Sequence, residues 1–185
     1  MVAKILQTAG LKAVACGNVG DTVIEAVDRK VPYDYLILEL SSFQLHWSEQ
    51  AEFVSAAILN IADDHLDWHG TFDVYADAKF SILDRADVAV LNADDQEVVT
   101  RANRFTGRKV FFSLDTPAPG EIGVVEELLV DRAFVSDPME AAMICELKDI
   151  TPTVPHNVSN ALAAAGLARA INVSHEDIQK ALQAF

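Results

Sequence analysis

The sequence predicts one α/β domain, in which a mainly parallel sheet is flanked by helices and carries a small antiparallel side sheet. Short apolar runs alternate with stretches of helical periodicity from residue 13 to residue 113. This alternation is typical of βαβ units with right-handed crossovers. After Asp115 the apolar runs become shorter, because prolines and glycines interrupt the chain. With 185 residues, 51% of them hydrophobic, the chain is long enough to bury one core.

The first elements are a helix, a short strand and a turn that contains glycine. Apolar residues share one helical face in residues 2–9, and Gly10 is a typical helix stop. No capping residue precedes this helix, as expected for a chain cut inside a larger protein. A strand is expected at residues 13–16, and Gly17-Asn18-Val19-Gly20 then leads into a helix at residues 22–27. This loop suits either a simple turn or an anion site at the start of the helix.

The strand expected at residues 35–39 is the element around which the chain is organised. Its four apolar residues predict a strand that is buried on both faces and ends at Glu39. A carboxylate at the carboxyl end of a parallel strand faces the crevice where open α/β sheets bind ligands. The polar residues that follow are Ser41, Ser42 and Gln44. They fit a ligand site, and they fit equally a strand-to-helix turn in which a serine caps the next helix.

A second polar segment follows the next strand. We expect a helix at residues 44–54 and a buried strand at residues 56–60. Three carboxylates and two imidazoles stand close together after this strand, namely Asp63, Asp64, Asp67, His65 and His69. Divalent cations bind carboxylate oxygens, and an imidazole can complete their coordination. The competing interpretation is an acidic turn that caps a helix.

The next helix carries a lysine close to its apolar stripe. This helix is expected at residues 72–83, and Lys79 is the lysine in question. A lysine in such a place commonly extends to solvent. Two more strands are expected at residues 88–92 and 109–113, and Asp94 is expected to cap the helix between them.

Residues 116–150 are expected to form a small antiparallel subdomain within the same domain. Its short strands are placed near residues 124–130, 132–135 and 142–147. Residues 151–155 form a linker to the last two helices. These helices are expected at residues 158–170, capped by Asn157, and at residues 176–185, capped by Ser174.

Charge and composition exclude several classes of function. The formal net charge of −14, from 28 acidic and 14 basic residues, opposes binding to nucleic acids and anionic membranes. Cys16 and Cys145 are too few for a disulfide framework, and no signal peptide is visible, so we expect a reducing cytoplasm. The chain contains no Gly-x-x-x-x-Gly-Lys-Ser/Thr loop, no Gly-x-Gly-x-x-Gly after a strand and no nucleophile elbow.

The segment that begins at Glu39 carries a resemblance. Glu39-Leu40-Ser41-Ser42-Phe43-Gln44-Leu45 is similar to a signature heptad of the Mur ligases of peptidoglycan synthesis, in the form found in the branch that adds D-glutamate. Other segments resemble this family in the same order: Gly17-Asn18-Val19-Gly20, Ile58-Leu59-Asn60 with Asp64-His65-Leu66-Asp67, Tyr75-Ala76-Asp77-Ala78-Lys79, Asn92-Ala93-Asp94-Asp95 and His156-Asn157-Val158-Ser159-Asn160-Ala161. The resemblance covers nearly the whole chain and is weakest at residues 116–153.

The resemblance implies the central, P-loop-type ATP-binding domain of a three-domain ligase. In such an enzyme ATP phosphorylates the carboxylate of UDP-N-acetylmuramoyl-L-alanine, and the amine of D-glutamate then attacks the acyl phosphate. Phosphoryl transfer of this kind needs Mg²⁺, because the triphosphate and the attacking carboxylate repel each other.

The resemblance also assigns roles to residues. It implies that Glu39, His65 and Lys79 form the catalytic metal site, with Glu39 and His65 as Mg²⁺ ligands and Lys79 carbamylated. Carbamylation needs a free amine, which a partly buried setting with a lowered pKa favours. The residues implied to contact the muramoyl-alanine substrate are Asn18, Ser41 and Gln44. The residues implied to lie near the adenine of ATP are Asn157 and Asn160.

The chain departs from the family pattern in two places. The phosphate-binding loop expected just before Met1 is missing from these residues, as are the amino-terminal UDP-binding and carboxyl-terminal domains. We therefore expect a truncated polypeptide that does not catalyse ligation by itself and that can associate through an exposed sheet edge. In addition, Val154-Pro155 stands before His156, where the family usually has a glycine, and this alters the expected adenine loop.

Two other interpretations stay open. The chain could be a non-catalytic module of ligase-like fold that holds a metal or a partner in its acidic pocket. It could also resemble folylpolyglutamate synthase, a relative with similar chemistry, although the heptad at Glu39 argues against this.

Overall fold

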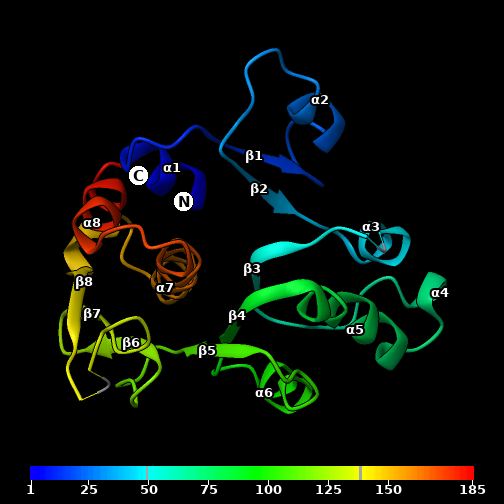
Figure 1. Ribbon diagram of the computed structural model, residues 1–185. Coiled ribbons are helices and arrows are strands. Elements are labelled where there is room, and N and C mark those ends of the chain that lie inside the picture. Colours follow the sequence, from blue (N-terminus) through cyan, green and yellow to red (C-terminus); the bar gives the residue numbers. More distant parts are fainter. Residues whose placement is uncertain (49, 138) are drawn as a thin grey trace.

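The computed structural model describes residues 1–48, 50–137 and 139–185. Strands β1 (Ala13–Gly17) and β2 (Tyr35–Glu39) pair in parallel and form a small sheet (Figure 1). The larger sheet has six strands in the order β3-β4-β5-β6-β7-β8. These strands span Phe53–Ile58, Ala86–Asn92, Arg108–Phe112, Ile122–Val125, Leu128–Asp131 and Ala142–Glu146. The predicted α/β class is therefore confirmed.

The antiparallel strands continue the large sheet instead of forming a sheet of their own. Strands β3 to β6 are parallel, and β6 to β8 are antiparallel. The junction is a single pairing of Phe112 with Ile122, beside which the Ser113 N–H donates to the Ile122 carbonyl at 3.2 Å. The expectation of a separate side sheet is corrected accordingly.

Two of the expected antiparallel strands also differ from those observed. The expected strand at residues 124–130 is a hairpin of β6 and β7, and Glu126 in its turn has a φ of 53°. The expectation of a strand at residues 132–135 is wrong. The Asp131 carboxylate accepts hydrogen bonds from the backbone N–H groups of Ala133 and Phe134, at 2.8 and 2.9 Å, and these bonds hold a turn there.

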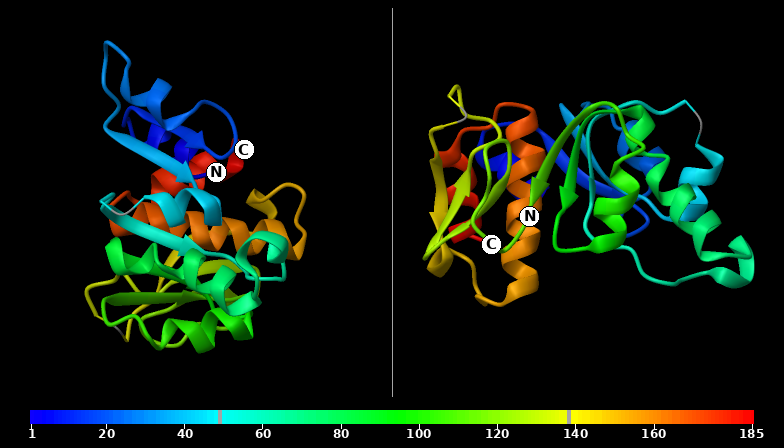
Figure 2. Two further views of the ribbon diagram at one scale, coloured as in Figure 1. Left: turned by 90° about the vertical axis from the view of Figure 1, so that its right-hand side faces the viewer. Right: turned by 90° about the horizontal axis from the view of Figure 1, so that it is seen from below.

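Helices cover both faces of the large sheet, which curls around α7 (Figures 1 and 2). Helix α7 contacts strands β3 to β6, whereas α5 and α6 pack against the opposite face. Helices α1 and α8 pack on each other beyond α7, and α8 also contacts β8. The helices span Val2–Thr8 (α1), Val23–Val27 (α2), Ser42–Trp47 (α3), Leu66–His69 (α4), Phe72–Phe80 (α5), Gln96–Ala102 (α6), Pro155–Ala170 (α7) and His175–Gln183 (α8).

Strand β4 shows how the sequence builds the two layers. Side chains alternate between the faces of a strand. Val88 and Val90 therefore join the core under α7, while Ala89 and Leu91 join the core under α5 and α6. Helix α7 approaches closely because it presents Gly166, where an added Cβ would lie 2.8 Å from Val90 Cγ1.

Several expected boundaries and caps are corrected. The expected helix at residues 44–54 ends at Trp47, and residue 49 within it lies outside the described residues. Asp95, not Asp94, caps α6, because the Asp94 carboxylate instead accepts the Leu114 N–H at 2.9 Å. Ser174 caps α8 as expected.

The start of α7 and the burial of β2 also differ from the expectation. Helix α7 begins at Pro155, a favoured first-turn residue, so Asn157 lies inside the helix instead of capping it. Residues 35–38 in β2 are half-buried and not buried on both faces. The reason is that β2 pairs with β1 alone.

A buried carboxylate fixes the last two helices to the sheet. Asp131 of β7 is fully buried, and its Oδ2 lies 2.8 Å from His175 Nε2 and 3.3 Å from Arg169 Nε. Burial alone would raise the pKa of Asp131, but hydrogen bonds from His175 and from the Phe134 and Ala133 N–H groups outweigh it and lower this pKa. Asp131 therefore stays ionised at neutral pH.

Among the residues that the structure describes, no helix combines the length and the apolar character that crossing a bilayer requires.

Candidate functional site

Glu39 lies at the carboxyl end of β2, as the sequence predicts, and a glycine permits its position. Gly17 pairs with Glu39 across the two strands and has a φ of 120°. An added Cβ at Gly17 would lie 2.4 Å from the Glu39 carbonyl oxygen, so only glycine fits there. The Asn18 N–H donates to this same oxygen at 2.7 Å, and Asn18 Nδ2 reaches the Glu39 carboxylate at 3.4 Å. Asn18 and Glu39 are thus neighbours at an exposed strand end.

The heptad turns from the strand directly into α3 by means of a capping box. Ser41 Oγ accepts the Gln44 N–H at 3.3 Å, while Gln44 Oε1 accepts the Ser41 N–H at 2.9 Å. The predicted capped turn is therefore confirmed, with Ser41 as the cap. Both side chains are half-buried and engaged with each other.

The acidic segment after β3 places His65 in a special backbone conformation. His65 precedes α4 with a φ of 51°, in the left-handed region that few residues other than glycine adopt. The Asp64 carboxylate holds it there: it accepts the His65 N–H at 2.9 Å and lies 3.3 Å from His65 Nε2. His65 remains exposed at the surface.

A row of ring contacts connects the heptad, the His65 segment and the helix of Lys79. The Phe43 ring lies 4.9 Å from the His65 ring and 5.7 Å from the His69 ring, between centroids. The His69 ring lies 5.4 Å from the Tyr75 ring, and Lys79 Nζ lies 5.7 Å from the centre of Tyr75. This ring row, which consists of His65, Phe43, His69, Tyr75 and Lys79, joins the heptad to two later, consecutive segments of the chain.

His69 and Tyr75 are the two buried members of the ring row. The His69 side chain is 7% exposed, and its Nε2 lies 2.9 Å from the Oγ of Ser42, which is 1% exposed. Its Nδ1 is buried without a hydrogen-bond partner. Burial lowers the pKa of His69, and the nearby His46 and His65 lower it further, so the imidazole is neutral at pH 7.

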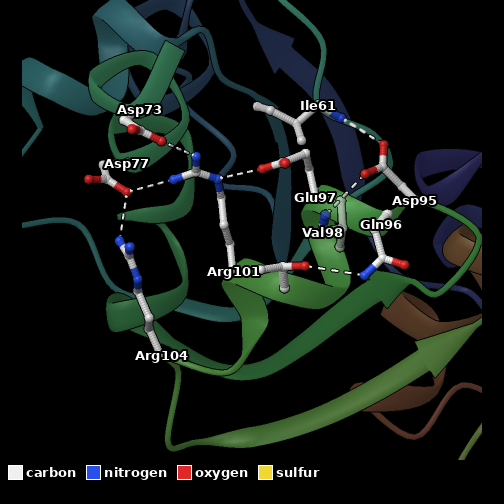
Figure 3. A network of polar contacts seen from close by, with 10 residues as sticks. Ile61, Asp73, Asp77, Asp95, Gln96, Glu97, Val98, Arg101 and Arg104 are labelled. Atoms are coloured by element: carbon white, nitrogen blue, oxygen red, sulfur yellow. Dashed lines mark hydrogen bonds and ion pairs between the residues drawn. The ribbon is translucent and has the colours of Figure 1, made fainter. Parts of the chain in front are cut away.

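The opposite side of α5 is held by an arginine of α6 (Figure 3). Arg101 is 9% exposed and binds Asp73 at 2.5 Å, Asp77 at 3.1 Å and Glu97 at 3.0 Å. Burial alone would lower the pKa of Arg101, but its bonds to Asp73 and Glu97 raise it. Because successive helical residues turn by about 100°, the two aspartates and Lys79 point away from each other on α5.

The predicted site residues are only partly brought together. His65, the heptad and the helix of Lys79 meet in the ring row, whereas Asn157 and Asn160 lie in α7 on the other face of the sheet. Asn157 is engaged locally, because its Nδ2 donates to the Pro152 carbonyl at 3.0 Å.

The described residues also contain no assembled metal site. Within residues 1–48, 50–137 and 139–185, no three His, Cys, Asp or Glu side chains are grouped closely enough to hold a metal ion. A carboxylate at Glu39 and an imidazole at His65 nevertheless match the donors that divalent cations accept. A surface hollow of about 370 Å³ lies beside Arg29 and Tyr33. Most of its lining residues come just before β2 in the sequence, so the hollow lies at the end of the strand away from Glu39.

In the sequence, Ser42 and His69 stand out only as polar residues of candidate ligand segments, and Phe43 and Tyr75 only as members of motifs. No local pattern predicts that these four side chains meet. The partnership of His69 with Ser42 spans 27 residues and needs the tertiary fold.

Relatives of known name match this chain over its whole length. The chain is 48% identical over 191 residues to UDP-N-acetylmuramoylalanine–D-glutamate ligase of Streptomyces coelicolor, and 47% identical to that of Thermobifida fusca. The alignment covers 100% of this chain and 41% of each relative, so the chain spans about two fifths of their length.

Solved structures share the fold of this chain, and a family model matches most of it. A UDP-N-acetylmuramoyl-L-alanyl-D-glutamate–2,6-diaminopimelate ligase shares the fold, with a TM-score of 0.70 at 18% identity over 100% of this chain and 42% of that one. MurF from Acinetobacter baumannii matches with a TM-score of 0.66 at 20% identity, over 98% of this chain and 42% of that one. The model of the Mur ligase middle domain matches residues 1–168. The chain therefore belongs to the Mur ligase family, as a middle domain of that family.

Proposed function

We propose that these residues form the central domain of an ATP-dependent ligase that adds D-glutamate to UDP-N-acetylmuramoyl-L-alanine. The observation that carries this proposal is the identity of 46–48% across the whole chain with three relatives that bear this ligase name. In the proposed reaction the substrate carboxylate attacks the γ-phosphorus of ATP and ADP leaves. The amine of D-glutamate then attacks the acyl carbon, and phosphate leaves as the amide forms. ATP and a UDP-linked substrate place this reaction in the cytoplasm.

We assign the metal-binding role to Glu39 and His65, with a carbamylated Lys79 as a further, anionic group. Mg²⁺ bound there would offset the negative charge of the triphosphate beside the attacking carboxylate. Asn18 lies within reach of Glu39 and is proposed, with Ser41 and Gln44, to contact the muramoyl-alanine substrate. Asn157 and Asn160 are proposed to lie near the adenine. The half-buried setting of Lys79 supports its modification by carbon dioxide.

A hybrid enzyme tests the proposal directly. The corresponding segment of the Streptomyces coelicolor ligase is replaced by these 185 residues, and release of phosphate is measured. We expect release that depends on ATP, on D-glutamate and on UDP-N-acetylmuramoyl-L-alanine. Glu39→Gln should lower kcat on the order of a hundredfold or more, because a charged metal ligand is lost. A folded hybrid without any D-glutamate-dependent phosphate release would contradict the proposal.

The 185 residues alone should release no phosphate under the same conditions, because they contain no phosphate-binding Gly-Lys-Ser/Thr loop.

The alternative of a non-catalytic module is tested by calorimetric titration with Mg²⁺ and nucleotide. Unchanged binding in Glu39→Ala would favour that alternative.

We also propose that the isolated chain self-associates through a sheet edge. Strand β3 stands at the edge of the six-stranded sheet and can offer its backbone groups to another chain. Sedimentation at increasing concentration measures this association, and a monomer throughout would rule it out.

A further inference from the structure

We infer that His69 is a positioning residue, which aligns the heptad of Glu39 with the His65 loop and with the helix of Lys79. The functional meaning of this alignment rests on the proposed function, whereas the evidence for it is the geometry of the contacts. His69 contacts the heptad twice, through the Ser42 hydroxyl at 2.9 Å and through the near-parallel Phe43 ring at an interplanar angle of 22°. It belongs to α4, and its own N–H donates to the His65 carbonyl at 3.0 Å.

The third contact reaches the helix of Lys79. The His69 ring meets the Tyr75 ring edge-on, and Tyr75 in turn lies beneath Lys79 Nζ. One side chain thus touches all three segments that carry the proposed metal site. Helices α3 and α4 are too short to hold their positions by backbone hydrogen bonds alone, so contacts of this kind must fix them.

The burial of His69 argues that the contact is specific. A buried polar nitrogen without a partner, such as His69 Nδ1, is destabilising. A phenylalanine would fill the same space without this cost. The only hydrogen bond that distinguishes this imidazole from a phenylalanine ring is therefore the one between its Nε2 and Ser42, which holds the heptad.

Four variants of the 185-residue chain separate positioning from packing. His69→Phe keeps the ring and removes the bond to Ser42, and Ser42→Ala removes the same bond from the other side. His69→Gln keeps a polar atom at about the reach of Nε2. His46→Phe is the matched control, because His46 is exposed and belongs to the same group of rings through Trp68, at 5.1 Å.

Two measurements are made on each variant. Nuclear Overhauser contacts between the Phe43 and His65 rings report the alignment of the heptad with the His65 loop without any metal. Titration with Mn²⁺ alone, in place of Mg²⁺, reports metal binding through broadening of the His65 ring signals. For His69→Phe and Ser42→Ala we expect weakened ring contacts and an Mn²⁺ requirement raised about tenfold or more. His69→Gln and His46→Phe should stay near the wild type.

The outcomes separate this inference from the proposed function. If His69→Phe and Ser42→Ala keep the ring contacts of the His46→Phe control, the positioning role is wrong. If these contacts weaken but the wild type shows no Mn²⁺ broadening at His65, the positioning role stands and the proposed metal site is wrong. Should His69→Phe fail to fold, Ser42→Ala and His69→Gln still decide between the outcomes.

Discussion

Glu39 occupies its place because the residue opposite it has no side chain. Gly17 combines a positive φ with an approach so close that a methyl group would meet the Glu39 carbonyl oxygen. Gly10 also has a positive φ, of 82°, but an added Cβ there would meet nothing within 4 Å. A side chain at Gly10 would therefore cause backbone strain alone, whereas a side chain at Gly17 would cause both backbone strain and a steric clash.

Alanine at these two positions should give different losses of stability. Gly10→Ala is expected to cost about 1 kcal/mol of unfolding free energy, because it forces a left-handed alanine. Gly17→Ala should cost roughly 2 kcal/mol more, since β2 must move away from β1. Urea denaturation of both variants measures the difference. Equal losses would show that the approach of Gly17 to Glu39 is not restrictive.

At the scale of helices and strands, the ion pairs of Arg101 fix the rotation of α5. Asp73 and Asp77 are one helical turn apart and both reach the same guanidinium (Figure 3). Their side of α5 is held against α6, and Tyr75 and Lys79 are thereby directed to the other side. Arg104 binds Asp77 at 2.9 Å but is 73% exposed, so the two arginines form a natural comparison.

Arg101→Ala should destabilise the protein by roughly 2 kcal/mol, because charged hydrogen bonds of a buried guanidinium are lost while its partners remain in water. Arg104→Ala should change stability by less than about 0.5 kcal/mol. Thermal unfolding of both variants measures the contrast. If Arg104→Ala were as damaging as Arg101→Ala, burial of the guanidinium would not be the cause.

Element types followed from the sequence more reliably than their ends and partners. The alternating apolar runs predicted β1 to β5, because strand and helix periods are local properties. The single pairing of Phe112 with Ile122 that joins the antiparallel strands to the sheet has no local signal. Helix α3 ends at Trp47 although the helical pattern continues, since β3 must begin at Phe53.

In the candidate site, too, local features were predictable from the sequence and long-range contacts were not. Glu39 at the end of a strand was predictable from the apolar run before it. The bond of His69 to Ser42 and the ring row are long-range contacts that no periodicity encodes. The chemical roles of Glu39, His65 and Lys79 remain proposals.

At the scale of the whole molecule, Asp131 ties together β7, α7 and α8 through His175 and Arg169. Its pKa in the folded protein is lowered. A carboxyl group whose pKa falls on folding adds stability above its unfolded pKa of about 4, and this stability is lost as the pH falls through the lower folded value.

Asp131→Asn should therefore cost about 3–5 kcal/mol at pH 7, because Arg169 and His175 lose a buried, charged hydrogen-bond acceptor. The difference from the wild type should shrink as the pH falls below about 4, where protonation makes the aspartate similar to asparagine. Urea denaturation between pH 3 and pH 7 measures this, with the exposed Asp87→Asn as the control. A difference independent of pH would show that charge is not the cause.

Apart from Tyr75, the ring row lies outside the two cores that surround β4. In the part of the chain that the structure describes, neither hydrophobic cluster includes a residue of α3 or α4. These two helices can consequently open while the sheet stays intact, and their amide hydrogens can exchange with solvent far sooner than those of β4. A molecule that bound to α3 and α4 would have to suppress this local opening. The free energy needed to order the two helices would reduce its affinity.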